Sequence, residues 1–424
     1  MTTLFEFDEW SRFTETHWER RPAVLRTPLT AAMSAPDHFA ALVSAADAWR
    51  AGRLVRPRDV RMLMGDGEVK SNSMAPLLPR AQDGDITSYI RRVDEHAHGD
   101  WHIVVNSLQQ FSWPLFSAAK EILDGIYRAA GSVPAGLTDC HLIAGSYGEA
   151  PTRIHKDTAT VMTFVLSGRK RFYTWPYETL VRYARTPDPL HHQVNLDIDF
   201  RDVVDQATVL EGEAGDVLYW PSDHWHCGES DGTPHLSVHL ATYTDNNLVR
   251  TLDSLVSTAL AERKADHWLD GFPYPPRVGA APDTVTNKAM AEMLVEIADE
   301  IPARFQAKRL RRASAVNFEF VPPPRGSAFS GDHARVDARF PVLFEPTADH
   351  GDALLIAVNG HVSKIPRLPW LEDLLSALNG AGSSGLDYRE HLGRTLPATE
   401  VAGAVSAATQ VLRFIDSAGG LVRP

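Results

Sequence analysis

The sequence predicts an α+β protein with an antiparallel β-barrel or sandwich in the middle and helices on either side. Short β-type runs begin near Trp101 and end at Tyr243, with Gly, Pro and Asp between them. Apolar residues before and after that stretch recur at helical spacing. A chain of 424 residues is long enough for several domains. We expect boundaries at 1–100, 101–245, 246–325 and 326–424.

Composition is that of an ordinary soluble globular protein, with 44% hydrophobic and 23% charged residues. No apolar run approaches the roughly 20 residues that a membrane-spanning helix needs. The N-terminus lacks a basic region followed by an apolar one, so we expect no signal peptide. Two cysteines, Cys140 and Cys227, exclude a disulfide framework and a multi-cysteine zinc finger. The simplest interpretation is a cytoplasmic protein with no membrane association.

The net charge of the chain favours some classes of binding partner over others. The formal net charge of −12 argues against a general nucleic-acid binder, whose affinity would come from neutralising phosphates. It is compatible with a basic protein partner or with a small molecule.

The first 100 residues are predicted to be mainly helical. "FDEWSRFTETHWERRP" spaces Trp10, Phe13 and Trp18 as a helix would, with core packing as the expected role, and it stops at Pro22. "VRPRDVRMLMGDG" indicates a short strand or turn, and "DGDITSYIRRVDEHAHG" a helix.

The central stretch supplies the strands of the barrel or sandwich. One helix, "FSWPLFSAAKEILDGIYRAAG", interrupts it. The predicted strands are "DCHLIAG", "TATVMTFVLSG", "KRFYTW", "VNLDIDF", "GDVLYWP" and "HLSVHLATY".

After Tyr243 the chain is predicted to be helical again. Four leucines lie on one broad face of the first helix: Leu248, Leu252, Leu255 and Leu260. A second helix runs through "NKAMAEMLVEIADEI", and "FVPPPRGS" marks a boundary near residue 325. The last 75 residues contain two helices and a possible terminal strand, typical of a small winged-helix module. Seven acids against six Lys or Arg between Asp352 and Arg423 favour packing or protein recognition over DNA binding.

A candidate metal site lies at the start of the most apolar predicted strand. Residues i and i+2 of a strand share a face, so His155 and Asp157 should project together. Ala159, Val161, Thr163 and Val165 should continue that inner face. "GDVLYWPSDHWHCGES" offers His226 as a further ligand, after a turn at Gly215 and Asp216. Two histidines and one carboxylate leave three positions open on an octahedral ion, which suits Fe(II) with a bidentate cosubstrate and dioxygen.

A lysine accompanies this candidate metal site. Ser167 and Gly168 form a turn, and Lys170 opens the returning strand. A lysine inside an apolar barrel needs a counter-charge, which a dicarboxylate cosubstrate would supply. Each piece also has an ordinary explanation: a chance His-x-Asp, an edge-strand lysine, or His224 and His226 as a solvated loop pair. Their order and strand context favour the site.

The two quoted segments together resemble the JmjC class of Fe(II)- and 2-oxoglutarate-dependent oxygenases. The class has His-x-Asp, a Gly-x-Lys/Arg fifteen residues after the histidine, and a histidine five residues past a Tyr-x-Pro; this chain matches without a gap. The flanking segments "FTETHWERRPAVLR" and "LSVHLATYTDNNLVRTLDSLVSTAL" resemble ribosomal oxygenases, which are protein hydroxylases. This resemblance implies a double-stranded β-helix (cupin or jelly-roll) core, a helical dimerisation region that makes a homodimer, and a winged helix.

The resemblance also implies roles for individual residues. His155, Asp157 and His226 would ligate Fe(II), and Lys170 would pair with the distal carboxylate of 2-oxoglutarate, helped by the hydroxyl of Thr152. O2 would be the other cosubstrate. No further catalytic residue is expected, because substrate geometry rather than an acid or base chooses the carbon.

This chain departs from the family pattern in two places. Relatives often have a tyrosine where this chain has Ile143, and Tyr147 or Ser146 could substitute for it. His239 is unusual on the last strand; it either contacts cosubstrate or substrate, or is simply buried with a hydrogen bond.

Three functions compete on this evidence. The first is an oxygenase that hydroxylates a side chain of a protein or peptide, possibly a basic one. The second is the same chemistry on a small metabolite or free amino acid, or a lysine demethylase. The third is a non-catalytic metal-binding cupin scaffold, which would not need Lys170. The identity of the substrate is left open.

Overall fold

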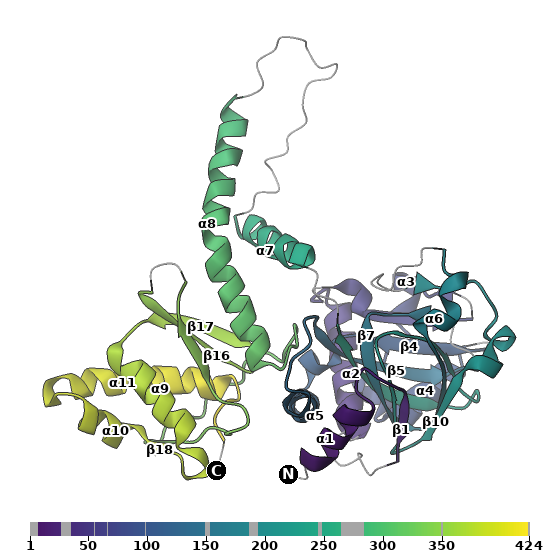
Figure 1. The fold of residues 1–424 in the computed structure, drawn as a ribbon, viewed down its shortest axis with the longest axis horizontal. Helices are drawn as coiled ribbons and strands as arrows, with labels where there is room; N and C mark the ends of the chain where they lie inside the picture. Colours follow the sequence, from purple (N-terminus) through teal and green to yellow (C-terminus); the bar gives the residue numbers. More distant parts are fainter. Residues whose placement is uncertain are drawn as a thin grey trace. The chain divides into compact units, whose positions relative to one another are not determined.

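The computed structural model describes most of the chain, and Figure 1 shows its ribbon. It divides into two compact units, Met1–Asn246 with Val316–Pro323, and Asn247–Ala315 with Pro324–Pro424. None of the helices in the described part is long and apolar enough to cross a membrane. The described residues are 7–26, 35–54, 56–65, 67–97, 99–148, 153–185, 194–244, 248–263, 284–348 and 351–422.

Helices of the first unit carry the apolar faces that the sequence predicts. Trp10 and Phe13 of the first helix are buried. Asp85 caps α4 by accepting a hydrogen bond from the Ser88 backbone N–H. The helices are α1 (Phe7–Thr16), α2 (Ala35–Arg50), α3 (Ser71–Met74), α4 (Ile86–Asp94), α5 (Trp113–Ala130) and α6 (Tyr177–Leu180).

An eight-stranded sheet forms one wall of this unit, and every pairing in it is antiparallel. In spatial order its strands are β1 (Ala23–Leu25), β11 (Val217–Trp220), β7 (Ala159–Ser167), β13 (His235–Tyr243), β5 (Thr138–Ser146), β4 (Trp101–Val105), β2 (Val60–Met64) and β3 (Gly67–Glu68).

A five-stranded antiparallel sheet forms the other wall. Its β10 contacts β11 and β1 of the first sheet. One apolar core contains side chains of both sheets: Ala159, Val161, Val165, Phe172, Leu210, Leu218, Trp220 and Ala241. The strands in order are β10 (Thr208–Glu213), β8 (Arg169–Pro176), β12 (His224–Glu229), β6 (His155–Lys156) and β9 (Val194–Asn195).

The predicted antiparallel barrel or sandwich is therefore confirmed, and so is the α+β class. One detail of the prediction is wrong. His155 does not share a strand with Val161 and Val165, because β6 belongs to the five-stranded sheet and β7 to the eight-stranded one. The chain changes sheets at Asp157. Alternation along a sequence gives the face of each residue, and it does not show where a strand leaves its sheet.

Other strands also differ from expectation. "VNLDIDF" forms only the two-residue β9, followed by the 3₁₀ turn η6 (Phe200–Asp202), where the Asp199 carboxylate accepts from the Arg201 backbone N–H. β1, β3, β10 and β12 were not predicted, whereas β2 forms where the sequence indicates a short strand or turn.

The second unit has its own cores. Ala259 of α7 (Leu248–Glu262) packs with Met293 and Ile297 of α8 (Thr284–Ser314). A three-stranded sheet and three helices enclose a second core. These elements are β15 (Leu343–Pro346), β16 (Ala353–Val358), β17 (His361–Pro366), α9 (Pro369–Gly380), α10 (Tyr388–Thr395) and α11 (Ala398–Ser417), with a small pair of β14 (His333–Ala334) and β18 (Leu386–Asp387). The winged-helix and dimerisation assignments remain predictions.

Candidate active site

Two histidines face each other across neighbouring strands of the five-stranded sheet. His155 of β6 is the direct register partner of His226 of β12, and their ring centroids are 4.2 Å apart. The Nδ1 of His155 lies 3.0 Å from the carbonyl of Arg153, and that of His226 lies 3.5 Å from the carbonyl of His224. An Nδ1–H donated to a carbonyl leaves the Nε2 lone pair available for a metal.

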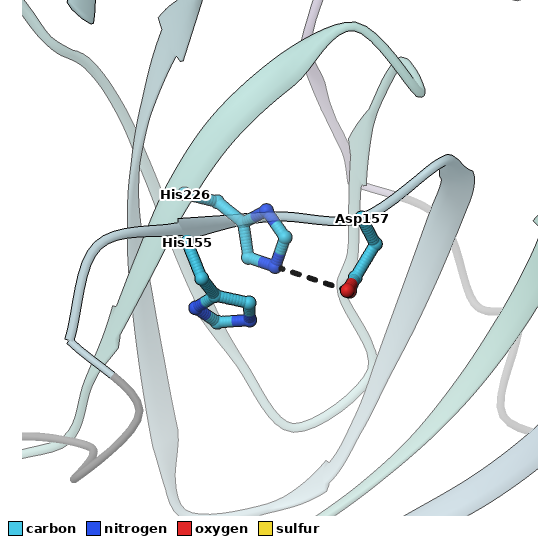
Figure 2. Close-up of side chains that lie close together, drawn as sticks. All are labelled: His155, Asp157 and His226. Atoms are coloured by element: carbon cyan, nitrogen blue, oxygen red, sulfur yellow. Dashed lines mark ion pairs between the residues drawn. The ribbon is translucent and has the colours of Figure 1, made fainter. Parts of the chain in front are cut away.

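Asp157 is the third residue of the candidate metal-binding group, and it lies where the chain passes from β6 in one sheet to β7 in the other. Its Oδ2 lies 3.9 Å from Nε2 of His226, and one ligand atom from each of the three residues falls within 4.8 Å of the others. Figure 2 shows the three side chains gathered around one space. Two imidazoles and a carboxylate are the donor set of a facial triad, so these residues fit a divalent metal such as Fe(II).

The environment of His226 keeps its ring neutral. Burial, and next the neighbouring His155, lower the pKa of His226 to about 3. The ring of Trp220 lies 4.9 Å from it between centroids, and that of Phe172 lies 6.4 Å away. Neutral imidazole is the form that binds a metal, and this histidine has that form at physiological pH.

Lys170 enters the space between the sheets from β8. Gly168 makes the preceding turn with φ +73°, and a Cβ there would lie 2.6 Å from the carbonyl oxygen of Pro234. Only glycine therefore fits this turn. The turn places Lys170 as the second residue of β8, with a side chain that is 2% exposed.

Lys170 has polar contacts but no counter-charge among the described residues. Its Nζ donates to the hydroxyl of Tyr147 and lies 3.2 Å from Nε2 of His235. Burial lowers the pKa of Lys170 to about 7. A buried ammonium without a carboxylate partner is costly, and a bound dicarboxylate would relieve that cost.

Tyr147 is the hydroxyl that meets Lys170, one of the two candidates that the sequence offered in place of Ile143. It follows β5 directly and is buried. Its ring lies 4.6 Å from that of His235 and 4.9 Å from that of His102, between centroids. Sequence reasoning missed His235 and His102, because neither belongs to a motif and only the fold brings them to the lysine.

His239 is buried and hydrogen-bonded at both ring nitrogens. Its Nδ1 lies 2.8 Å from Oγ1 of Thr163, and its Nε2 lies 3.0 Å from Oγ of Ser237. The ring stacks on His141 with centroids 4.6 Å apart. These contacts fit the simpler alternative of burial with hydrogen bonds, and contact with cosubstrate remains a prediction.

Two other residues named from the sequence have different outcomes. Thr152 lies outside the described residues. His224 is not part of a solvated loop: it is buried at the start of β12, with Nδ1 2.6 Å from the carboxylate of Asp223.

Residues 137–248 match the family model of the JmjC domain. No curated protein sequence matches the chain. The chain is similar to the X-ray structure of E. coli ycfD, with 17% identity, 97% of each chain covered and a TM-score of 0.48. The chain is also similar to two structures described as YcfD, a ribosomal oxygenase from Escherichia coli. The one in complex with cobalt and 2-oxoglutarate has 15% identity, 97% of each chain covered and a TM-score of 0.44. The one in complex with cobalt and succinic acid has 16% identity, 97% of each chain covered and a TM-score of 0.43.

The family model carries the assignment, because it spans the two-histidine, one-carboxylate group and Lys170. Its match confirms the resemblance seen in the sequence motifs. This chain therefore carries, at residues 137–248, a JmjC domain, the domain of Fe(II)- and 2-oxoglutarate-dependent oxygenases.

Proposed function

We propose that this protein is an Fe(II)- and 2-oxoglutarate-dependent oxygenase that hydroxylates a side chain of a protein or peptide. The observation that supports it best is the combination of the facial triad with a buried lysine that has no counter-charge among the described residues. A metal-binding scaffold would need the triad alone. A carboxylate entering the same space would supply the counter-charge that Lys170 lacks.

His155, Asp157 and His226 would hold the metal through two imidazoles and one carboxylate. When bound, Fe(II) and 2-oxoglutarate supply the O2 chemistry that converts a C–H bond to C–OH while 2-oxoglutarate becomes succinate and CO2. The protein's own contribution is placement. The backbone carbonyls at Arg153 and His224 orient the two imidazoles, and the sheet pairing fixes their separation.

Lys170 would bind the distal carboxylate of 2-oxoglutarate through a charge-assisted hydrogen bond. Tyr147 already contacts the ammonium, so its hydroxyl is placed to share that carboxylate. The rings of Phe172 and Trp220 pack beside His226 and would limit the access of water to it. No general base is required, because the geometry of the bound substrate decides which hydrogen is removed.

The substrate class, a protein or peptide, is proposed on grounds other than the geometry of the site. It rests on the resemblance of the flanking segments to protein hydroxylases and on the net charge of −12, which would attract a basic partner over long range. That attraction should weaken with salt. A homodimer through α7 and α8, a protein-recognising C-terminal module and a cytoplasmic location belong to the same proposal.

The test is to incubate the full-length protein, Fe(II), ascorbate and 2-oxoglutarate with ribosomal proteins and, separately, with a panel of metabolites and free amino acids. Succinate formation coupled to a +16 Da shift on a protein would support the proposal. Asp157→Ala should be inactive, whereas Asp205→Ala, which alters an exposed carboxylate, should keep full activity. Turnover confined to metabolites or free amino acids would overturn the protein substrate and leave the oxygenase intact.

A further inference from the structure

Arg61 lies on the face of the eight-stranded sheet that lines the candidate active site. It is the direct register partner of Val104 in β4, and Val104 is the partner of Ile143 in β5. Directly paired residues share a face, and so do residues i and i+2, which adds His141 to the same face. His141 in turn pairs with His239. The chain therefore places an arginine on the site's own wall, outside every motif that identifies the domain.

The interior beside this arginine is accessible. On β7, the inward-facing side chains of Val161 and Val165 are 4% and 1% exposed. On β5, the inward-facing His141 and Ile143 are only partly buried, and so is Arg61 on β2. The inner face is thus filled on the β7 side, and Val104 of β4 is also buried. The side chains left partly exposed to a ligand on this wall are those of Arg61, His141 and Ile143.

Arg61 has no partner within the part of the chain that the structure describes. Its Nε is buried without a hydrogen-bond partner, and its guanidinium makes no ion pair there. Other partly buried arginines of this unit are paired: Arg92 with Asp83 at 2.6 Å, and Arg171 with Glu229 at 2.9 Å. An unpaired guanidinium with a buried donor is unfavourable unless a ligand supplies the acceptor.

The charge of Arg61 acts on two histidines of the site, His102 and His141. Burial, then the charge of Lys170 and then that of Arg61 lower the pKa of His102 to about 3. Burial lowers the pKa of His141 to about 4, and the charge of Arg61 adds to this effect. The carboxylate of Asp157 also acts on His141. By contrast, burial alone lowers the pKa of Lys170. Arg61 is therefore close to His102, on which Lys170 also acts, and to His141, on which Asp157 also acts.

We propose that Arg61 binds a carboxylate of the substrate and thereby selects substrates with an acidic group close to the hydroxylated carbon. This inference rests on the proposed function and names a substrate class for it. The planar guanidinium offers a fork of N–H donors that matches a carboxylate, and its charge disfavours a cationic side chain at the same position. The net charge of −12 concerns long-range attraction of a whole partner, whereas Arg61 acts at contact distance.

The experiment compares the full-length wild type with Arg61→Met, Arg61→Lys and the control Arg58→Met. Arg58 lies three residues away, is 81% exposed and pairs with Glu68 at 3.1 Å, so its loss tests an arginine outside the site. Each protein receives a random peptide pool, a pool with all Asp and Glu replaced by Asn and Gln, versions of both with free and amidated C-termini, and a panel of free carboxylic acids. Mass spectrometry reads the +16 Da products.

Wild type and Arg58→Met should hydroxylate substrates that have a carboxylate near the modified residue. Arg61→Met should lose about tenfold or more of kcat/KM on those substrates, mostly through KM, and Arg61→Lys should retain part of it. The pools tell a side-chain carboxylate from a C-terminal one, and the free acids reveal a small-molecule source. Equal use of acidic and amide pools by wild type, or an unchanged preference in Arg61→Met, would overturn the proposal.

A second readout does not depend on turnover. The Nε–H resonance of Arg61, assigned by its loss in Arg61→Met, is followed while the full-length protein is titrated with N-acetyl-aspartate or N-acetyl-asparagine. A saturable shift with the aspartate compound alone supports the proposal even if no peptide is hydroxylated, in which case only the proposed function fails. No saturable shift with either compound would overturn the role of Arg61 whatever the enzyme does to peptides.

Discussion

His155 and His226 are direct partners across two antiparallel strands, with ring centroids 4.2 Å apart. Sheet hydrogen bonding fixes the separation of such a pair before any ligand binds. Asp157 lies just after one of these strands, where the chain crosses to the other sheet. Strand register therefore positions the two histidines, and the connection between the two sheets positions Asp157.

This arrangement predicts that metal binding is lost when one imidazole is removed. Loss of an outer-shell partner already costs roughly 10–100-fold in metal affinity, so His226→Gln should cost about 100-fold or more. His224→Gln changes a buried histidine on the same strand outside the group and should bind Mn(II) within a few-fold of wild type. Calorimetric titration of the metal-free protein with Mn(II) measures both. Equal losses in the two variants would contradict the assignment of His226.

The sequence could predict this group because its residues lie close together along the chain or follow a turn. Strand alternation gave the inward face of Val161 and Val165, and the Gly168 turn gave the entry of Lys170. The change of sheet at Asp157 was not predictable, since alternation continues through it.

The residues around Lys170 were beyond sequence reasoning for a different reason. Tyr147 and His235 lie 88 residues apart and meet only because β5 and β13 pair. Arg61 is further removed, two strands from β5 through β4. Long-range strand pairing brings such side chains together, and no local pattern in the sequence records it.

Self-association through the second unit is a further prediction. Leu255 is buried and Leu260 packs on the α7–α8 core, so part of the predicted leucine face is used within the chain. The apolar side chains left exposed on these helices include Leu252 at 39%, Leu294 at 47% and Val295 at 61%.

Light scattering at micromolar concentration should give twice the chain mass of 46.8 kDa. Leu294→Asp combined with Val295→Asp should give the monomer mass, because two buried carboxylates are costly in an interface. Val133→Asp, at a position 57% exposed in the other unit, is the matched control. A monomer for the wild type would count against the dimer.

The low pKa of Lys170 predicts a pH dependence of cosubstrate binding. Its pKa of about 7 in the protein without cosubstrate means that the ammonium is largely neutral above pH 7. A carboxylate needs the protonated form, so binding must take up a proton there. The affinity for 2-oxoglutarate should therefore be constant below about pH 6 to 7 and fall by up to about tenfold per pH unit above it.

Calorimetry of the Mn(II)-loaded protein in buffers of different ionisation enthalpy measures both the affinity and the proton uptake. Lys170→Arg should remove the dependence, since a guanidinium stays charged, and Lys170→Ala should weaken binding by about two orders of magnitude. Arg169→Ala, at an exposed neighbour, is the control. A flat wild-type profile from pH 7 to 9 would show that Lys170 is not the anchor.

The contact between Tyr147 and Lys170 predicts that the Tyr147 hydroxyl strengthens the binding of 2-oxoglutarate. A tyrosine hydroxyl supplied from position 143 should be able to replace it. Tyr147→Phe removes a hydrogen bond to a charged group in a buried place, which costs roughly 1.5–3 kcal/mol, so the apparent constant for 2-oxoglutarate should rise by about tenfold or more. Tyr183→Phe, at an exposed ring, should leave it unchanged. The family resemblance of the sequence leads us to expect a tyrosine at the position of Ile143, which shares the inward face of β5 with His141. The double variant Ile143→Tyr with Tyr147→Phe should therefore recover much of the lost affinity, measured as succinate formation against cosubstrate concentration.

Recovery in the double variant would show that Tyr147 replaces the family's hydroxyl. A double variant as weak as Tyr147→Phe alone, with an unchanged unfolding temperature, would show that the Tyr147 hydroxyl has another role.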